Sequence, residues 1–281
     1  MSILTDVGVT HENVLFGDRT WIRAGTYLLN SIIGSDTFIN FACGIYNSTI
    51  GNNTQIASKV QIGSKSGITR TIVGDCCWIG ADSIIRDGVI IGDNCVIGAN
   101  ADVYQNIPDN SVAYCKNGSL IVHDREFTFD ALPEFKKLFE YNLSLGKQSS
   151  DYSCDKDGNY LLADIRGEDF QIGRNNILVG RSSTNGYIQI GENVLIGNNN
   201  ILEGAGKIRI GPNTKIGNNV HILSNSHNYH FASLPMILEP TYIGENVIID
   251  DDTLILGGTI IPNNVHLEKR SFVLKNKVIK R

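Results

Sequence analysis

The feature that most constrains this chain is an aliphatic residue that returns at every sixth position. The repeat forms two long runs and stops between them. Neither the 3.6-residue period of a helix nor the two-residue alternation of an ordinary strand gives a spacing of six, whereas a solenoid of short strands joined by tight corners does. We call these aliphatic residues the anchors. They are Ile33, Ile39, Ile45, Ile50, Ile56, Ile62, Val73, Ile79, Ile85, Ile91, Ile97 and Val103 in the first run, and Ile172, Leu178, Ile190, Ile196, Leu202, Ile210, Ile216, Ile222, Ile243, Ile249, Ile255, Ile261, Leu267 and Val273 in the second.

Two other positions keep step with the anchors. Many anchors are followed by glycine, as expected at a corner that leaves no space for a side chain. A small or β-branched residue stands four positions after the anchor, and we expect it to point inward. Cys77 and Cys95 hold this position 18 residues apart, so we expect them to stack in successive coils as small apolar side chains.

Composition limits the function classes. Apolar residues make up 42% of the 281 residues, enough for a large core, and the net charge of −5 predicts no nucleic-acid partner. A polyanionic ligand would need a local basic patch. The chain shows no secretory leader and no run of 18 apolar residues, so we expect no integral membrane segment and a cytoplasmic location, peripheral to the inner membrane if its pathway works there. The six cysteines form no CxxC pair, which fits a reducing compartment.

The repeat pattern resembles the hexapeptide-repeat family, whose fold is a left-handed parallel β-helix of triangular cross-section. The resemblance implies a mainly β protein with two such β-helical domains in tandem, over residues 1–118 and 171–281. Residues 119–170 lack the repeat and form the predicted linker. Within it, apolar residues at helical spacing between Leu132 and Leu143, behind Pro133, predict a short amphipathic helix.

The second run contains one long interruption. From Ile222 to Ile243 the next anchor is 21 residues away, so the chain extrudes a loop that holds the string SNSHNYHF, residues 224–231. Such a loop adds nothing to a solenoid core, and loops on rigid scaffolds commonly carry function. A neutral imidazole is the usual group that takes a proton from a hydroxyl near pH 7, which makes His227 the candidate general base. The alternative is that His227 is an inert polar residue of an exposed loop.

The longer string SHNYHFASLPMILEPTYIGENV resembles the polysaccharide O-acetyltransferases of this family. By that resemblance His227 is the catalytic base, which deprotonates the acceptor hydroxyl as it attacks the thioester of acetyl-CoA, without a covalent acyl-enzyme. Asn225, Tyr229 and His230 would contact the acceptor, although an aromatic that anchors the loop explains Tyr229 equally well.

The resemblance also implies how coenzyme A binds. Members of the family hold the pantetheine arm of coenzyme A in a groove between neighbouring β-helices, so a homotrimer is expected. The resemblance also implies that acetyl-CoA is a co-substrate and that no metal is needed. Gly257 and Gly258 would contact the arm, although Ile248 and Asp250 depart from the family's Trp-Ile-Gly-Ala segment. The basic carboxyl end would meet the 3′-phosphate through Lys269, Arg270 and Lys275; the alternative is a solvated basic tail.

The first run keeps other parts of the family pattern. Trp78 stands in a CWIGA segment, and Asn40 opens an NFAC segment that resembles an acceptor-contacting asparagine of sugar acetyltransferases. The position of the histidine loop holds only GSKSGITR. Either the first half is a relict repeat kept for assembly and acceptor contacts, or the halves divide one site, with Asn40 or Trp78 facing His227.

Two rival functions remain open. Zinc carbonic anhydrases share the fold, but their three-histidine site is poorly matched by His221, His227 and His230, because His221 lies at an outward position and the spacing differs. A non-catalytic scaffold would not need the long loop. The sequence therefore predicts an acetyl-CoA-dependent sugar O-acetyltransferase of bacterial surface polysaccharide or glycoconjugate synthesis, acting on a small or oligosaccharide acceptor, with an amino-sugar N-acetyltransferase as the runner-up.

Overall fold

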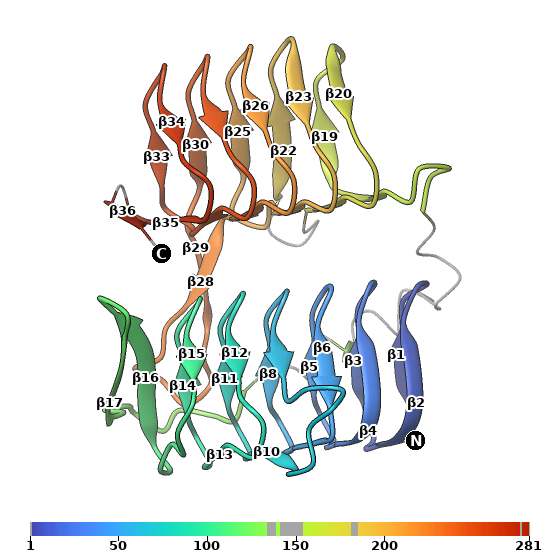
Figure 1. Cartoon of the computed structure of the whole chain (residues 1–281), viewed down its shortest axis with the longest axis vertical. Helices are drawn as coiled ribbons and strands as arrows, with labels where there is room; N and C mark the ends of the chain where they lie inside the picture. Colours follow the sequence, from blue (N-terminus) through green and yellow to red (C-terminus); the bar gives the residue numbers. More distant parts are fainter. Residues whose placement is uncertain (1, 134–138, 141–153, 181–184, 276, 281) are drawn as a thin grey trace. The chain divides into compact units, whose positions relative to one another are not determined.

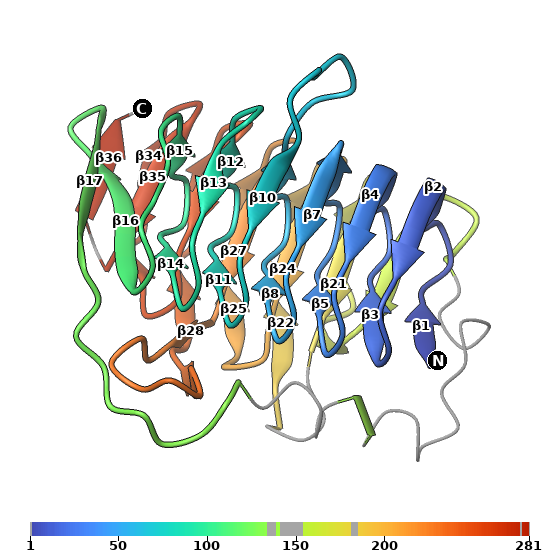
Figure 2. The same ribbon diagram turned by 90° about the horizontal axis from the view of Figure 1, so that it is seen from below.

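The computed structural model describes residues 2–133, 139–140, 154–180, 185–275 and 277–280. The chain divides into two compact units, drawn in Figures 1 and 2. The first unit contains the described residues of Met1–Tyr152 together with Asn228–Pro235, and the second contains those of Ser153–His227 and Met236–Arg281.

Short strands build the first unit. Two sheets hold them, in the orders β1-β3-β5-β8-β11-β14-β16-β17 and β13-β10-β7-β4-β6-β9-β12-β15, with β2 beside β4. The long strand β4 bends across a corner, because its first half pairs with β6 and its second half with β7. The strands are β1 (Ile3–Thr5), β2 (Thr10–Phe16), β3 (Thr20–Ile22), β4 (Tyr27–Ile33), β5 (Phe38–Ile39), β6 (Gly44–Tyr46), β7 (Ser48–Ile50), β8 (Gln55–Ile56), β9 (Gln61–Ile62), β10 (Thr71–Val73), β11 (Trp78–Ile79), β12 (Ile84–Ile85), β13 (Ile90–Ile91), β14 (Val96–Ile97), β15 (Asp102–Val103), β16 (Ser111–Lys116) and β17 (Ser119–Asp124).

The second unit has three faces. Its sheets run β18-β21-β24-β27-β32-β35-β36, β19-β22-β25-β30-β33 and β20-β23-β26-β31-β34, and β28 pairs with β29 apart from them. The strands are β18 (Tyr160–Leu162), β19 (Asp164–Arg166), β20 (Phe170–Ile172), β21 (Ile177–Val179), β22 (Tyr187–Ile190), β23 (Val194–Ile196), β24 (Ile201–Glu203), β25 (Ile208–Ile210), β26 (Lys215–Ile216), β27 (His221–Leu223), β28 (Asn225–His227), β29 (Met236–Leu238), β30 (Thr241–Ile243), β31 (Ile248–Ile249), β32 (Leu254–Ile255), β33 (Ile260–Ile261), β34 (His266–Leu267), β35 (Ser271–Leu274) and β36 (Lys277–Lys280).

The anchors form the core of each unit. Ile39, Ile56, Ile79 and Ile97 lie in register on successive parallel strands, and none is more than 1% exposed. The other anchors are buried in the same way, except Ile172, which is half-buried at the start of the second unit. The predicted left-handed parallel β-helix is confirmed.

The small inward residues do more than fill space. The Thr37 hydroxyl donates to the carbonyl of Gly51 at 3.0 Å, and Thr54 donates to that of Gly74 at 2.8 Å, each across to the next coil. Two thiols make the same contact: Cys77 donates to the carbonyl of Gly92 at 3.1 Å, and Cys95 donates to that of Pro108 at 3.0 Å. Both thiols are completely buried, as expected of packing residues. Because a thiol is a weak donor in the same position, cysteine replaces threonine here without breaking the pattern.

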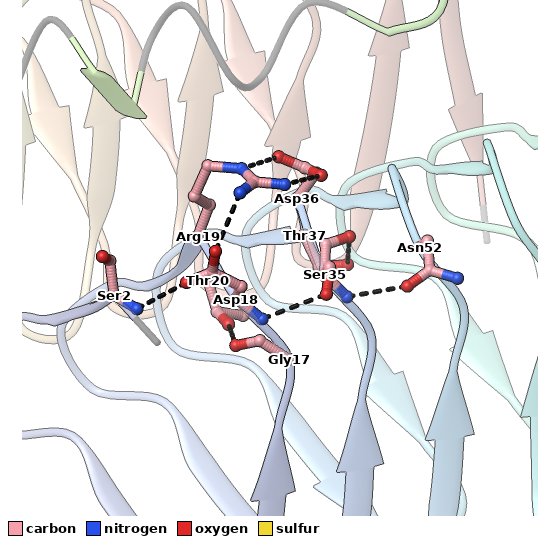
Figure 3. A network of polar contacts seen from close by, with 9 residues as sticks. All are labelled: Ser2, Gly17, Asp18, Arg19, Thr20, Ser35, Asp36, Thr37 and Asn52. Carbon is pink, nitrogen blue, oxygen red and sulfur yellow. Dashed lines mark hydrogen bonds and ion pairs between the residues drawn. The ribbon is translucent and has the colours of Figure 1, made fainter.

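Corners need two different residues. A Cβ on Gly34 would lie 2.6 Å from the carbonyl carbon of Gly51 in the next coil, so the close approach of coils requires glycine there. The left-handed conformation occurs instead three residues after many anchors, where Asn or Asp stands; Asn53 has a φ of 52°. Polar side chains then link the corners, as in the series from Ser2 through Asp18 and Ser35 to Asn52 in Figure 3.

The stretch between the two runs is partly described. β17 returns antiparallel along β16, and β18 and β19 already belong to the sheets of the second unit. Most of the predicted amphipathic helix lies outside the described residues. Phe139 and Glu140 are described and are helical. No helix in the described ranges has the length and apolar character that crossing a bilayer demands.

Removing one anchor side chain should destabilise the first unit. Ile56 is fully buried, so Ile56→Ala should lower the free energy of unfolding by about 2–5 kcal/mol through lost burial and the cavity left behind. Ile68 lies in the loop that projects between β9 and β10 (Figure 2) and is fully exposed. Ile68→Ala should therefore change the free energy of unfolding by no more than about 0.5 kcal/mol. Urea titration followed by tryptophan fluorescence measures this unit alone, since both tryptophans of the chain, Trp21 and Trp78, lie in it. Equal effects of the two substitutions would contradict the assignment of the core.

Candidate functional site

The interruption of the second run is a hairpin. After β27 the chain leaves the coil and forms β28, which pairs antiparallel with β29 before the coil resumes at β30. Asn225 lies opposite Leu238, Ser226 opposite Ile237 and His227 opposite Met236. His227 is therefore the last residue of a paired strand, and it is half-buried.

The base of the hairpin collects several of the expected residues. A Cβ on Gly257 would lie 2.9 Å from the backbone nitrogen of Asn225, so glycine is needed for β28 to pass. The Gly258 amide donates to the carbonyl of Glu239 at 3.0 Å, and the Lys275 ammonium lies 3.1 Å from the Glu239 carboxylate. The Oδ1 of Asn225 is buried and accepts no hydrogen bond from the described residues. The second unit thus brings together five residues: Asn225, Glu239, Gly257, Gly258 and Lys275. Asn225 lies on β28, two positions before His227.

Glu239 was not expected from the sequence. It lies just after β29, where its amide donates to the carbonyl of Ser224 at 2.9 Å and closes the hairpin base. A lone Glu in an extruded loop carries no motif, and only its proximity to Lys275 gives it a role. The ion pair is partly exposed, and pairs of this kind contribute about 0–1 kcal/mol.

The other two expected phosphate contacts lie at a corner. The Lys269 ammonium is 3.5 Å from the Asp252 carboxylate, and Arg270 has a φ of 63°, a left-handed corner conformation. Lys269 and Asp252 are linked across coils, which is a structural contact that leaves much of the lysine exposed.

Residues 228–235 form the tip of the hairpin, and they belong to the first unit. The Tyr229 carbonyl accepts a hydrogen bond from Arg125 at 2.9 Å, and the rings of Tyr229 and His230 lie 4.3 Å apart. The His230 Nδ1 is 3.3 Å from the carbonyl of Glu126. The contact of Tyr229 with Arg125 is made by its main chain, so it decides neither the acceptor role nor the anchoring role of the aromatic ring. His227 and Asn225 belong to the second unit.

Asn40 and Trp78 lie on the first unit. The Asn40 carbonyl accepts the Thr26 hydroxyl at 2.9 Å between successive coils. Trp78 lies on β11 and packs beside an apolar cluster formed by Val96, Val112 and Leu234. Trp78 therefore faces the tip of the hairpin within this unit.

His221, His227 and His230, the three histidines of the zinc alternative, do not form a metal site in the described part of the chain. His221 flanks the inward Ile222, as expected of an outward position, yet it is completely buried, and its Nε2 lies 3.1 Å from the Glu203 carboxylate. Across the described part of the chain, no three His, Cys, Asp or Glu side chains are arranged to hold a metal ion.

Two family models match the chain. The model for bacterial transferase hexapeptides (six repeats) matches residues 70–101, and the model for the hexapeptide repeat of succinyl-transferase matches residues 187–224. Hexapeptide repeats are thus recognised in both runs of the chain. The family resemblance inferred from the six-residue spacing is thereby confirmed in both runs. No curated protein matches the chain.

Several solved structures are similar to part of the protein. The acetyltransferase domain of PglB from Neisseria gonorrhoeae is 17% identical, with 43% of this chain and 58% of that one covered at a TM-score of 0.39. A maltose O-acetyltransferase from Clostridium difficile is 25% identical, with 44% and 66% covered at 0.32. An N-acyltransferase, AntD, from Bacillus cereus in complex with dTDP and 3-hydroxybutyryl-CoA is 18% identical, with 52% and 89% covered at 0.40. The hexapeptide-repeat protein thus spans less than two thirds of the first two of these chains.

The contact between Asp130 and the tip should depend on pH. Hydrogen bonds from the Ser233 hydroxyl (2.5 Å) and amide (3.0 Å) lower the pKa of the Asp130 carboxyl to about 2 from its ordinary 3.8. A lowered folded-state pKa means that the carboxylate stabilises the folded unit above pH 3.8 and that this contribution is lost as the pH falls through 2. Asp130→Asn should therefore lower the unfolding free energy of the first unit near pH 6, and the difference should shrink as the pH falls from about 4 toward about 2.

Tryptophan-monitored urea titrations at several pH values measure this difference. Asp124→Asn on β17, whose carboxylate makes no hydrogen bond to the tip, is the matched control for the loss of one carboxylate. A difference between Asp130→Asn and the wild type that stays constant down to the lowest pH would show that the carboxylate does not hold Ser233.

Proposed function

We propose that this hexapeptide-repeat protein transfers the acetyl group of acetyl-CoA to a sugar hydroxyl, with His227 as the general base. The observation that carries the proposal is the hairpin β28–β29, which interrupts a regular β-helix and whose first strand ends at the half-buried residue His227. A solenoid gains no core from such a hairpin, so the excursion calls for a role outside folding. A bacterial surface polysaccharide or glycoconjugate is the acceptor class that fits the sequence resemblance.

The proposed step is a direct transfer. The neutral imidazole of His227 accepts the proton of the acceptor hydroxyl as its oxygen attacks the thioester carbonyl carbon. The carbon–sulfur bond breaks, the imidazolium returns the proton to the departing thiolate, and the products are an acetyl ester and free coenzyme A. General base catalysis of this kind typically contributes ~10²–10⁴-fold in rate.

The base of the hairpin suits a thioester arm. Gly257 and Gly258 present backbone without side chains, Gly257 beside the main chain of Asn225 and Gly258 beside Glu239. Lys275, with Lys269 and Arg270 at the corner, would supply positive charge for the 3′-phosphate, with Glu239 releasing Lys275 on binding. We expect the protein to act as a homotrimer, as the family resemblance implies.

An amine acceptor would use the same base. The assay therefore pairs acetyl-CoA with a panel of free hexoses, N-acetylhexosamines and nucleotide-linked amino sugars, and detects released thiol. An amino sugar as the best acceptor would make the protein an N-acetyltransferase and leave the role of His227 unchanged. No thiol release with any acceptor would favour a scaffold.

Loss of the imidazole should abolish most of the activity. His227→Ala should lower kcat by at least ~10²-fold with little change in the KM for acetyl-CoA, because a general base acts in the transition state and not in donor binding. Thiol release with the best acceptor measures it. His123→Ala, on the exposed strand β17, is the matched loss of a histidine and should keep wild-type kcat. Near-normal turnover by a folded His227→Ala variant would remove the mechanism.

The role of Lys275 can be separated from stability by a change in the donor. Lys275→Ala should raise the KM for acetyl-CoA about tenfold, a loss on the scale of one charge-assisted hydrogen bond. It should leave the KM for acetyl-dephospho-CoA unchanged, because that donor lacks the 3′-phosphate. Lys215→Ala on β26 is the control cation. An equal rise for both donors would show that Lys275 does not contact this phosphate.

A further inference from the structure

The first unit holds the tip of the hairpin by side-chain hydrogen bonds, a main-chain bridge and apolar packing. The Arg125 guanidinium donates to the carbonyls of Tyr229 (2.9 Å) and Phe231 (2.7 Å). Thr128 forms an isolated parallel bridge with Phe231. The Thr128 amide donates to the carbonyl of His230 at 2.8 Å, and the Thr128 carbonyl accepts a hydrogen bond from the amide of Ala232 at 2.9 Å. All these residues belong to one compact unit.

A side-chain contact and an apolar contact complete the set. The Asp130 carboxylate accepts both the amide and the hydroxyl of Ser233. Leu234 is 2% exposed and packs against Val96 and Val112 on β14 and β16. We call Arg125, Thr128 and Asp130 the clasp. It lies in a stretch of chain that carries no hexapeptide repeat.

The burial of Arg125 is unusual, because arginine carries a charge and is rarely buried unless it is paired. It is 5% exposed, and its three hydrogen bonds all go to main-chain carbonyls, including that of Asn94 at 3.0 Å at a corner of the β-helix. Burial lowers the pKa of the guanidinium, since a charge removed from water is costly when no carboxylate pairs with it, and none of the described residues supplies one. The cation therefore ties the tip to a rigid corner at an energetic cost.

Leu234 carries a second sign of constraint. Its φ is 51°, a left-handed conformation that bulky residues rarely adopt and that persists only where surrounding structure imposes it. Here the imposing structure is the apolar pocket of Val96 and Val112, beside Trp78. The tip is thus held in one conformation that its own sequence does not favour.

The held tip begins one residue after His227. The β28–β29 pairing ends at His227 and Met236, and the Asn228 amide then donates to the carbonyl of Pro235 at 2.9 Å to close the tip. The main chain of His227 therefore lies between a paired strand and a clasped loop. A hairpin of three residue pairs alone is marginally stable in water, so the clasp is what keeps the strand end ordered.

We propose that the first unit serves the reaction by holding this tip, and that Arg125 and Asp130 are positioning residues for His227. The inference rests on the proposed function of His227. It adds a role to the two considered for the first half, since neither a relict repeat nor a divided site by itself calls for a buried arginine that contacts the loop. Misplacement of a base by about 1 Å can cost 10²-fold in rate, so a held loop matters.

The experiment compares Arg125→Ala and Asp130→Ala with Asp124→Asn, a nearby carboxylate substitution outside the clasp. Amide hydrogen exchange at Ala232 and Ser233 reports whether the tip is released, and the imidazole signals of His227 in NMR spectra report whether the base has moved. Kinetics with acetyl-CoA and the best acceptor of the panel give kcat and KM. A residue that only stabilised the fold would leave the His227 signals and kcat of the folded protein unchanged.

Both clasp variants should speed exchange at these amides, shift the His227 signals and lower kcat about tenfold or more, with the KM for acetyl-CoA unchanged. The control should match the wild type in all three. Faster exchange with unchanged His227 signals and kcat would overturn the proposal, as would unchanged exchange in both variants. If Arg125→Ala fails to fold, the exposed Asp130 decides alone. If the proposed function fails, with His227→Ala fully active, the exchange and the imidazole signals still show whether the clasp holds the tip and places the ring.

Discussion

Hydrogen bonds between parallel rungs hold successive coils of each unit at the strand spacing of about 4.8 Å, and the regular part of this protein follows from that spacing. Only one inward side chain per face fits at this distance, so an aliphatic anchor must return at each face, as at Ile39, Ile56 and Ile79. The same spacing leaves no room for a Cβ at Gly34 and lets small inward residues with a hydroxyl, such as Thr37, donate to a carbonyl of the next coil. The repeat in the sequence is the direct image of this constraint.

A structure so regular has few places for chemistry. The faces are occupied by strands and the corners by Asn, Asp and Gly, so a reactive group needs an excursion from the coil. The hairpin β28–β29 is such an excursion, and it begins from β27, whose anchor Ile222 is fully buried. The rigid coil thus supplies a fixed base for Asn225, while the tip takes its order from the first unit. The proposed base, His227, is the last residue of β28 and belongs to the second unit.

The sequence predicted the parts of the protein that the repeat governs. The anchors, the inward cysteines and the extruded loop at His227 all follow from counting residues, because each coil imposes the same local rule. Glu239 and Arg125 follow no local rule. The hydrogen bond from Arg125 to Tyr229 joins residues 104 positions apart, and only the fold brings them together. The burial of His221 was likewise hidden, since an outward position says nothing of what lies over it.

The central claim is that the imidazole of His227 takes the proton in the rate-determining transfer. The most direct measurement compares two titrations of the same protein: the His227 ring signals by NMR, and kcat/KM for acetyl-CoA with the best acceptor across pH. The account predicts that kcat/KM rises with pH through the midpoint at which the His227 ring loses its proton. A rate profile with no limb at that midpoint would contradict it.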